Sequence, residues 1–248
     1  MTSEAVVVLQ ARMGSRRLPG KSLAAVGGVP IVALCLRRLL VSDVGPVLLA
    51  TTTEPEDDCL VAEAARLGIA AIRGSRDDVL GRFVQAVSQT RAAFVVRATA
   101  DNPAVDIDGA RRVLEGLERW GADYCCERGL PVGGAVEAIR TSALIDASAR
   151  AMSDADREHV TTCSRCDRSR YRVATPDAPR AVRRPDVRLT IDTQADLAFM
   201  RSIAVTVSAR LASASFSAII AAADQVQVRD GPGDGDRLAG SDRELCSD

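Results

Sequence analysis

Short apolar runs alternate with helix-like stripes along the first half of the chain. The runs that predict strands are 5–9, 47–50, 70–72 and 94–98. Apolar residues at helical spacing fill the intervals, after Pro30 (placed in a first helical turn), between Thr53 and Leu67, after Ser75, and from Val113 to Trp120. This alternation predicts an α/β fold with three layers, in which a mostly parallel sheet carries helices on both faces.

Local signals place the ends of several helices. Thr53 with Glu56, and Ser75 with Asp78, have the spacing of a capping box at a helix start. Gly68 is placed to end the first of these helices. Beyond Tyr124 the order loosens, and strands are predicted at 136–139, 171–174 and 187–191.

The final segment differs in composition from the rest of the chain. From Val228 onward it lacks apolar periodicity and is rich in Gly and Asp, so we expect one domain over residues 1–227 and a disordered tail over 228–248.

Composition excludes several classes of protein. The 32 basic and 33 acidic residues give a net charge of -1, and aromatics make up 3%, which argues against nucleic-acid and anionic-membrane partners. No apolar run approaches the ~20 residues of a membrane span. The chain enters a strand within a few residues, so no signal peptide is expected. The chain has seven cysteines, an odd number, and most lie inside periodic segments (Cys35, Cys59, Cys125 and Cys126). All seven are expected to be reduced, in keeping with a cytoplasmic enzyme.

A glycine-rich basic loop follows the first predicted strand. It contains Gly14, Ser15 and Gly20 together with Arg12, Arg17 and Lys21. Glycines let the backbone approach an anion, and arginine and lysine supply charged donors to phosphate oxygens. The spacing matches neither a P-loop nor a Rossmann dinucleotide fingerprint. The loop therefore predicts a phosphate site of another kind.

The string A-R-M-G-S-x-R-L-P-G-K at 11–21 resembles the signature loop of the cytidylyltransferases that make CMP-activated sugars. That group includes the 3-deoxy-manno-octulosonate and acylneuraminate enzymes, and the resemblance is strongest to the spore-coat polysaccharide branch, up to about Ile203. It implies a nucleotide-diphospho-sugar transferase (Rossmann-like) fold and a homodimer. It also implies transfer of CMP from CTP to a sugar acid or another small phosphate- or phosphonate-type acceptor, with Mg²⁺ as cofactor and pyrophosphate as leaving group.

The resemblance also implies roles for residues of the loop. Arg12 and Lys21 would act as catalytic residues that neutralise the triphosphate. The nucleotide would also contact Ala11, Met13, Gly14, Ser15 and Arg17, with backbone N–H groups near Met13–Ser15 assisting.

A second string, R-G-S-R-D-D-V-L-G-R at 73–82, resembles another family motif. On that basis Arg73 and Arg82 are expected to bind the nucleotide. A capped amphipathic helix that exposes an arginine would explain the same spacing, so both interpretations stay open.

Two acids are the predicted metal ligands. Asp101 follows the run 94–98 and Asp192 follows the run 187–191, and strand ends at the carboxyl edge of an α/β sheet are where ligands bind. The resemblance assigns both positions to Mg²⁺, although Ala100 replaces the usual glycine. Asp101-Asn-Pro could instead form a simple turn.

Asp106 and Asp108 form an alternative D-x-D metal motif of the glycosyltransferase type. Because they precede a predicted helix, capping explains them better.

The acceptor side is less clear. Glu137 and His159, the latter in R-E-H-V-T, match family motifs and are the expected acceptor-binding residues. Ala135 stands where relatives usually carry an aspartate, which changes which acceptor groups can be held. Cys163 and Cys166 form a C-x-x-C without the further ligands of a usual zinc site. A glycosyltransferase using a nucleotide sugar and a non-catalytic nucleotide-binding protein remain alternatives.

Overall fold

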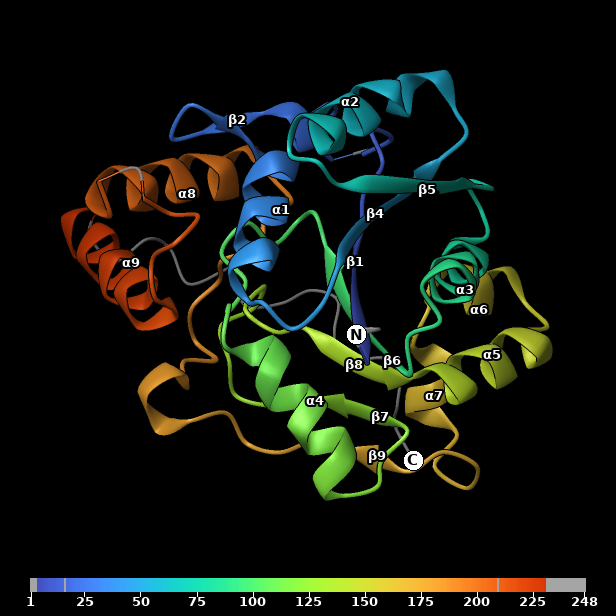
Figure 1. Ribbon diagram of the computed structural model, residues 1–248. Coiled ribbons are helices and arrows are strands. Elements are labelled where there is room, and N and C mark those ends of the chain that lie inside the picture. The colour runs from blue at the N-terminus through green and yellow to red at the C-terminus, as the bar shows by residue number, and fades with distance from the viewer. Residues whose placement is uncertain (1–3, 16, 209, 231–248) are drawn as a thin grey trace.

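The computed structural model describes residues 4–15, 17–208 and 210–230, and a seven-stranded sheet forms its centre (Figure 1). In spatial order the strands are β5 (Ala70–Gly74), β4 (Val47–Thr52), β1 (Ala5–Gln10), β6 (Phe94–Thr99), β8 (Glu137–Arg140), β7 (Tyr124–Cys126) and β9 (Val173–Ala174). A small antiparallel hairpin, β2 (Ala25–Val26) and β3 (Val29–Pro30), follows the first loop.

The sheet is parallel in its first half and mixed in its second. Strands β5, β4, β1 and β6 pair in parallel, whereas β8 runs antiparallel to both β6 and β7. The predicted three-layer α/β class is confirmed. Strand β7 was not predicted, because its three residues give too short an apolar run to separate from the helix before it.

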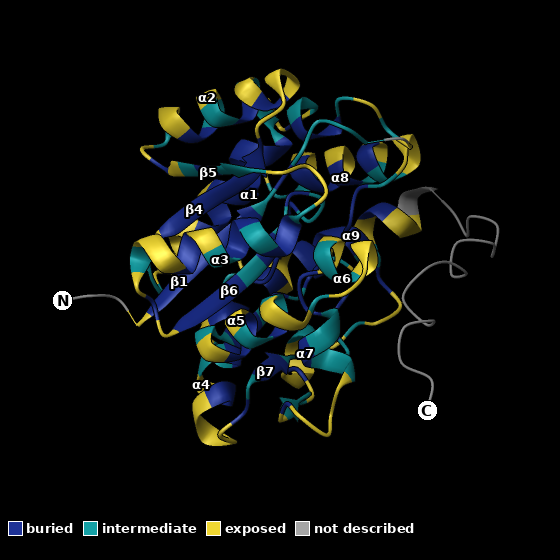
Figure 2. Cartoon of the chain, turned by 90° about the vertical axis from the view of Figure 1, so that its right-hand side faces the viewer, coloured by how far each residue is buried: buried dark blue, intermediate teal, exposed yellow. Residues whose placement is uncertain are grey.

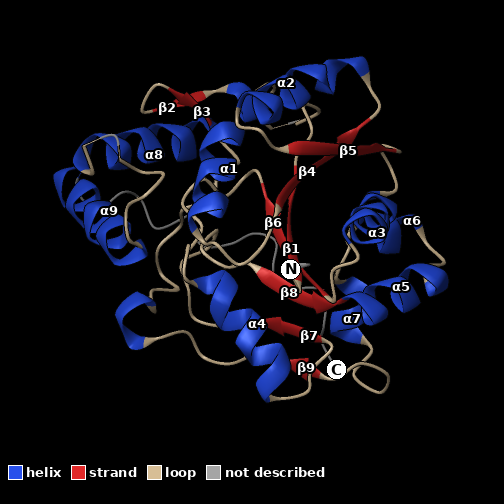
Figure 3. Ribbon diagram, in the orientation of Figure 1, coloured by secondary structure: helices blue, strands red, loops and turns tan. Residues whose placement is uncertain are grey.

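Helices cover both faces of the sheet (Figure 3). One side carries α1 (Ile31–Val41), α2 (Asp58–Arg66), α4 (Gly109–Arg119), α8 (Gln194–Thr206) and α9 (Phe216–Asp230). The other side carries α3 (Val79–Thr90), α5 (Thr141–Arg150), α6 (Asp154–Glu158) and α7 (Thr162–Cys166).

Each central strand contributes to two hydrophobic cores. In β1, Val7 and Leu9 pack toward α1 while Val6 and Val8 pack toward α3. All four side chains are fully buried, as the dark sheet in Figure 2 shows. This two-sided burial explains why the strand is a continuous apolar run without alternation.

The segment predicted as a strand at 187–191 does not join the sheet. It is extended, but its backbone bonds to loops: Leu189 N–H donates to Val132 O (2.7 Å), and Ile191 N–H donates to Asp101 O (2.8 Å). The second bond brings the residue after Ile191 beside Asp101. Val187, Leu189 and Ile191 are buried because this segment crosses the hydrophobic core. Its backbone N–H groups donate to carbonyl groups of loops, and not to a neighbouring strand.

Three of the predicted helix starts are wrong in detail. A 3₁₀ turn at Pro55–Asp57 precedes α2, so no capping box forms between Thr53 and Glu56. Helix α3 is capped by Asp78, whose carboxylate accepts from Gly81 N–H (2.8 Å), and not by Ser75. Pro30 likewise precedes α1 as its N-cap rather than lying in the first turn.

The expected domain end at 227 falls inside the last described helix. Helix α9 continues through Asp230, three residues past the expected domain end at 227. The rest of the predicted tail, 231–248, lies outside the described residues. None of the described helices is long and apolar enough to cross a membrane.

Candidate active site

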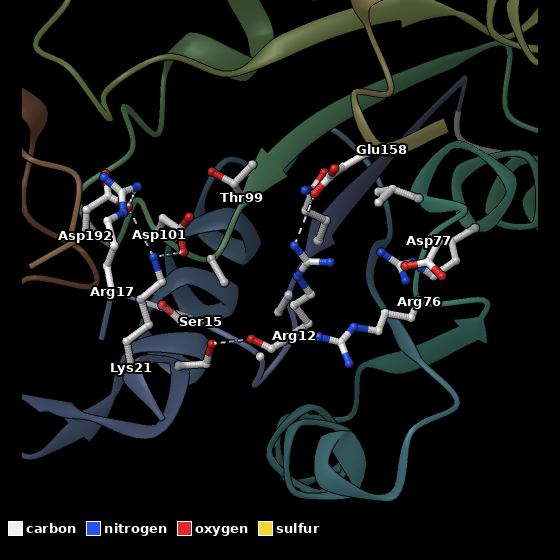
Figure 4. Close-up of a pocket in the computed structure, with 17 residues that line it drawn as sticks. Arg12, Ser15, Arg17, Lys21, Arg76, Asp77, Thr99, Asp101, Glu158 and Asp192 are labelled. Carbon is white, nitrogen blue, oxygen red and sulfur yellow. Dashed lines mark hydrogen bonds and ion pairs between the residues drawn. The ribbon is translucent and has the colours of Figure 1, made fainter. Parts of the chain in front are cut away.

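A cavity of about 770 Å³ opens at the carboxyl ends of β1 and β6 (Figure 4). Nine of the predicted site residues line it: Ala11, Arg12, Gly14, Ser15, Arg17, Lys21, Arg82, Asp101 and Asp192. The fold thus brings together residues from four separate parts of the chain, at the edge of the sheet where α/β proteins bind ligands.

The glycine loop owes its shape to two devices. Gly20 adopts φ 72°, a left-handed conformation that glycine takes without strain, and this turns the chain into the 3₁₀ turn at Lys21–Leu23. At the other end, the buried carboxylate of Asp57 accepts from Met13 N–H (2.7 Å) and from Thr52 N–H (3.3 Å). Asp57 therefore ties the loop to the end of β4.

The backbone amides of the loop are not arranged as the sequence suggested. Met13 N–H is engaged by Asp57, and Ser15 N–H donates to Met13 O (2.7 Å). Met13 does not line the cavity. In this loop the cationic side chains, rather than the amides of Met13 and Ser15, face the cavity.

Lys21 joins the loop to both predicted metal ligands. Its Nζ lies 2.7 Å from Asp101 Oδ1, 3.3 Å from Asp192 Oδ1 and 2.9 Å from Ile191 O. The side chain is only 10% exposed, so this ion pair is well shielded from water. The two carboxylates meet at one cation, as Figure 4 shows.

The two carboxylates differ in their surroundings. Asp192 also contacts Arg17 Nη2 (2.9 Å) and Arg188 Nη2 (2.7 Å), and its side chain is 16% exposed. The Asp101 side chain is 43% exposed and opens toward the cavity. Asp101 is thus the more accessible carboxylate, and Asp192 is the one that balances several cations.

This pair fits a hard divalent cation. Among the described residues no cluster of three or more His, Cys, Asp or Glu could hold a metal alone. Mg²⁺ does not need such a cage, because it commonly binds one or two carboxylates and completes its shell with water and substrate phosphates. Asp101 and Asp192 supply that minimal oxygen set next to basic side chains.

Arginines gather at the opposite end of the cavity. Arg12 Nη2 lies 3.2 Å from Glu158 Oε1, which bridges the first loop to α6. Arg82 is buried, donates to Ser75 O (2.7 Å), and leaves its Nε without a partner among the described residues. Burial, and then the neighbouring Arg12, lower the pKa of Arg82. A buried, incompletely bonded arginine beside another cation is suited to an anionic ligand.

Eight lining residues were not among the predicted site residues: Gln10, Ser22, Arg76, Asp77, Val79, Thr99, Ala100 and Glu158. Arg76 packs so close to the first loop that a Cβ on Gly14 would lie 3.3 Å from its Nη2. Arg76 lies inside the motif at 73–82, between the two arginines chosen from it, and Glu158 directly precedes His159 in the R-E-H-V-T motif. Gln10 and Thr99 end β1 and β6, which was the available signal.

Met13 and three further predicted residues lie outside the cavity lining. Arg73 braces β4, donating to Thr52 O (2.8 Å) and Glu54 O (3.0 Å). His159 is exposed, and its neighbour Glu158 takes the place in the cavity expected for it.

Glu137, the third of these, belongs to a polar network behind the cavity. It pairs with Arg97 and accepts hydrogen bonds from the hydroxyls of Tyr124 (2.6 Å) and Thr161 (3.2 Å). Burial raises the pKa of Glu137, but Arg97 and the Tyr124 hydroxyl together lower it further, so the net pKa lies below its ordinary value. Glu137 is therefore ionised. It lies on β8, next to β6, and holds Arg97 of β6 in place behind the cavity.

The alternative D-x-D acids serve the fold. Asp106 is 2% exposed, pairs with Arg112 Nη2 (2.7 Å), and accepts from Asp108 N–H (3.1 Å). Neither acid lines the cavity. Asp108 is the N-cap of α4 but its side chain makes no capping hydrogen bond, so the predicted capping role is wrong in detail. The contacts of Asp106 are structural and give no support to a glycosyltransferase-type metal motif.

The described cysteines give no sign of a metal site. Cys35, Cys59, Cys125, Cys126 and Cys163 are free thiols. Burial raises the pKa of Cys35 and Cys125, the latter to about 12, so these side chains are neutral and unreactive.

The chain matches a family model described as cytidylyltransferase over residues 6–229. It is 33% identical over 207 residues to the spore coat polysaccharide biosynthesis protein SpsF of Bacillus subtilis, a match that covers 81% of this chain and 86% of that one. It is also 32% identical over 119 residues to a 3-deoxy-manno-octulosonate cytidylyltransferase of Rhodopseudomonas palustris, covering 46% and 48% of the two chains.

Solved structures give the same picture. A cytidylyltransferase from Leptospira borgpetersenii superposes with a TM-score of 0.80 at 26% identity, covering 90% of this chain and 94% of that one. A CMP:2-keto-3-deoxy-manno-octonic acid synthetase complexed with CTP superposes with a TM-score of 0.61 at 19% identity, covering 81% and 98%. The second match supports the fold.

Proposed function

Because this chain belongs to the cytidylyltransferase family, we propose that it transfers CMP from CTP to a small-molecule acceptor and releases pyrophosphate. The observation that carries the proposal is the cavity itself. Five cations, Arg12, Arg17, Lys21, Arg76 and Arg82, line one space with the carboxylates Asp101 and Asp192. The cations would bind the triphosphate, and the two carboxylates would bind its metal ion.

The cations divide the work of binding the triphosphate. Arg12 and Arg82 present forked donors at one end, and Arg17 lies over Asp192 at the other. Arginine in this role gives bidentate, charge-assisted bonds to phosphate oxygens. Lys21 stays between the carboxylates and supplies a fixed positive charge where the leaving pyrophosphate gains negative charge.

Asp101 and Asp192 would hold Mg²⁺, which when bound neutralises and orients phosphate oxygens. The chain's own contribution is positioning. An oxygen of the acceptor attacks the α-phosphorus of CTP, a new P–O bond forms, and the bond to pyrophosphate breaks. Reactions of this type depend on alignment and charge neutralisation rather than on a covalent enzyme intermediate.

The acceptor class follows from relatives rather than from a residue in this cavity. We propose a sugar acid or a similar small anion, because a relative acts in spore coat polysaccharide biosynthesis and others use 3-deoxy-manno-octulosonate, as their names state. Ala135, in the place of an aspartate, packs against the hydrophobic core and does not line the cavity. A cytoplasmic location and a homodimer complete the proposal, and sedimentation would test the dimer.

Pyrophosphate release tests the reaction. The assay pairs CTP, ATP, GTP or UTP and Mg²⁺ with a panel of sugar acids, sugar phosphates and phosphonates, and uses Asp101→Asn as the inactive control. Release that requires CTP and one acceptor class is expected. CTP binding without release for any acceptor would favour a non-catalytic nucleotide-binding protein. Release of a nucleoside diphosphate from a nucleotide sugar would favour a glycosyltransferase.

A further inference from the structure

Polar side chains interrupt the apolar sheet face that packs against α3 and α5. Gln10, Arg97 and Glu137 lie on this face of β1, β6 and β8, where the residues two positions earlier or later belong to the core. Arg97 is directly opposite Glu137, and Gln10 is directly opposite Thr99. The network starts in the interior and ends at the cavity, because Gln10 and Thr99 line it.

Arg97 determines which way the Gln10 amide points. Arg97 Nε donates to Gln10 Oε1 (3.1 Å), and its Nη1 pairs with Glu137. A guanidinium has donors only, so the amide oxygen of Gln10 must face it and the amide NH₂ must face away. Glu137 in turn is held by Tyr124 and Thr161, which fixes the whole chain of contacts.

The Thr99 hydroxyl, like the Gln10 amide, accepts a hydrogen bond from the protein. Its Oγ1 accepts from Asn102 Nδ2 (3.0 Å), which leaves the hydroxyl hydrogen available to another acceptor. Figure 4 shows Thr99 between Asp101 and the Arg12–Glu158 pair. The cavity wall therefore carries two side chains that each already accept one hydrogen bond from the protein and each have hydrogens available to donate.

We propose that the amide of Gln10 and the hydroxyl of Thr99 form a subsite for the carboxylate of the acceptor molecule. Gln10 determines specificity, and Arg97 and Glu137 are positioning residues that act through it. A carboxylate accepts hydrogen bonds and gives none, so it complements a pair of donors. This inference rests on the proposed function, since it names the chemical group that the acceptor must carry.

The subsite lies next to the proposed metal ligands. Thr99 is two residues before Asp101, so a group held here lies beside the carboxylates that would hold the metal. The Lys21 ammonium, 2.7 Å from Asp101, and the Arg12–Glu158 pair lie on either side of Thr99 (Figure 4). A glutamine needed only to satisfy Arg97 would be buried, whereas Gln10 is partly exposed to the cavity.

The test uses the full-length protein and pyrophosphate release from CTP with a panel of sugar acids and their carboxamide derivatives. Gln10→Glu keeps an oxygen toward Arg97 but removes the donor. Loss of one hydrogen bond to a charged group predicts a rise of about tenfold to hundredfold in the KM for the sugar acid, with the KM for CTP changed less than about twofold. Gln89→Glu, the same change at an exposed site on α3, is the matched control.

Two further variants guard against a folding defect. Gln10→Met and Thr99→Val remove the donors without adding charge, and both should raise the acceptor KM alone. Glu137→Gln should raise the acceptor KM in the same selective way, because it loosens Arg97. A purely structural role would lower kcat or affect both substrates.

Each outcome bears on the inference. An unchanged acceptor KM in Gln10→Glu and Gln10→Met overturns it. So does equal turnover of a sugar acid and its carboxamide, or the absence of any active sugar acid while CTP still binds. If CTP does not bind at all, the proposed function fails first and this inference fails with it.

Discussion

Lys21 stabilises the fold and is also proposed to bind the nucleotide, and its place in a polar loop of the sequence predicts only the second role. It is buried, and its ammonium group contacts Asp101, Asp192 and the Ile191 carbonyl. Removing it would leave two carboxylates facing each other without their shared cation. Like charges at short range in a shielded site destabilise the fold as well as the ligand complex.

This residue gives the first prediction. Lys21→Ala should lower both the melting temperature and CTP affinity, whereas Arg12→Ala, at a side chain 39% exposed, should lower CTP affinity with little change in melting temperature. Each lost charge-assisted contact corresponds to roughly 1.5–3 kcal/mol of binding free energy. Calorimetric titration of CTP with Mg²⁺ and thermal unfolding separate the effects. Equal melting temperatures for both variants would contradict the buried bridge.

The acidic residues give a second prediction. Asp101→Asn and Asp192→Asn should each abolish Mg²⁺-dependent turnover, because a hard cation loses a charge and an oxygen ligand. Asp106→Asn should reduce stability by breaking the pair with Arg112, yet leave most of the turnover, and Asp108→Asn should do little to either. Turnover measured against Mg²⁺ concentration for all four variants decides it. An inactive but folded Asp106→Asn would contradict the site as assigned.

At the scale of elements, helix α6 contacts the first loop through Glu158 and Arg12. The Glu158 carboxylate forms an ion pair with the Arg12 guanidinium, which is the group proposed to bind the triphosphate. The two therefore compete for Arg12.

Glu158→Gln should consequently tighten CTP binding. Because the ion pair is exposed, the expected gain is small, a few-fold at low salt, and should shrink as salt is added. Isothermal titration with CTP and Mg²⁺ measures it, with Glu118→Gln on α4 as a control for the loss of one negative charge. Weaker CTP binding in Glu158→Gln alone would mean that Glu158 contacts the nucleotide itself.

The pairing of β6 with β8 gives a prediction about pH. The pKa of Glu137 is lower in the folded state than its ordinary value of 4.5, because Arg97 and Tyr124 outweigh burial. Its stabilising contribution is therefore complete above about pH 4.5 and is lost as pH falls through the lowered folded-state value. Thermal unfolding between pH 3 and pH 7 should show that Glu137→Gln has lost part of this acid dependence. Parallel curves for the two proteins would contradict it.

At the scale of the whole molecule, the cavity depends on segments far apart in the chain. The first loop, the start of α3, the end of β6 and the segment before α8 all reach it. A ligand that bridges them should stabilise the entire fold rather than one region.

CTP with Mg²⁺ should therefore raise the melting temperature, and more than ATP, GTP or UTP do. At 100 times its Kd the stabilisation is about 2.7 kcal/mol. For a chain of this size that corresponds to a shift on the order of 5–10 °C. Thermal shift with the four nucleotides measures it, and Asp192→Asn is the control that should lose the Mg²⁺-dependent part. A larger shift with GTP or UTP would contradict the preference.

The sequence by itself determined the features that depend on neighbours along the chain. Continuous apolar runs predicted the central strands β1, β4 and β6, because both faces of a parallel sheet are buried. A shorter run predicted the edge strand β5. The first loop and the acids at 101 and 192 were identifiable from residue type and motif. Thr193 and Asp196 form a capping box at the start of α8, which also depends only on near neighbours because its contacts span three residues.

Only the tertiary structure decided the features that depend on distant partners. The bond from Ile191 N–H to Asp101 O brings the two acids together across 90 residues of chain, and no local pattern encodes it. Pairing with Arg97 assigns Glu137 to the wall behind the cavity, and pairing with Arg112 removes Asp106 from metal binding. A charged side chain takes its role from the opposite charge that folding brings to it, and local spacing does not report that charge.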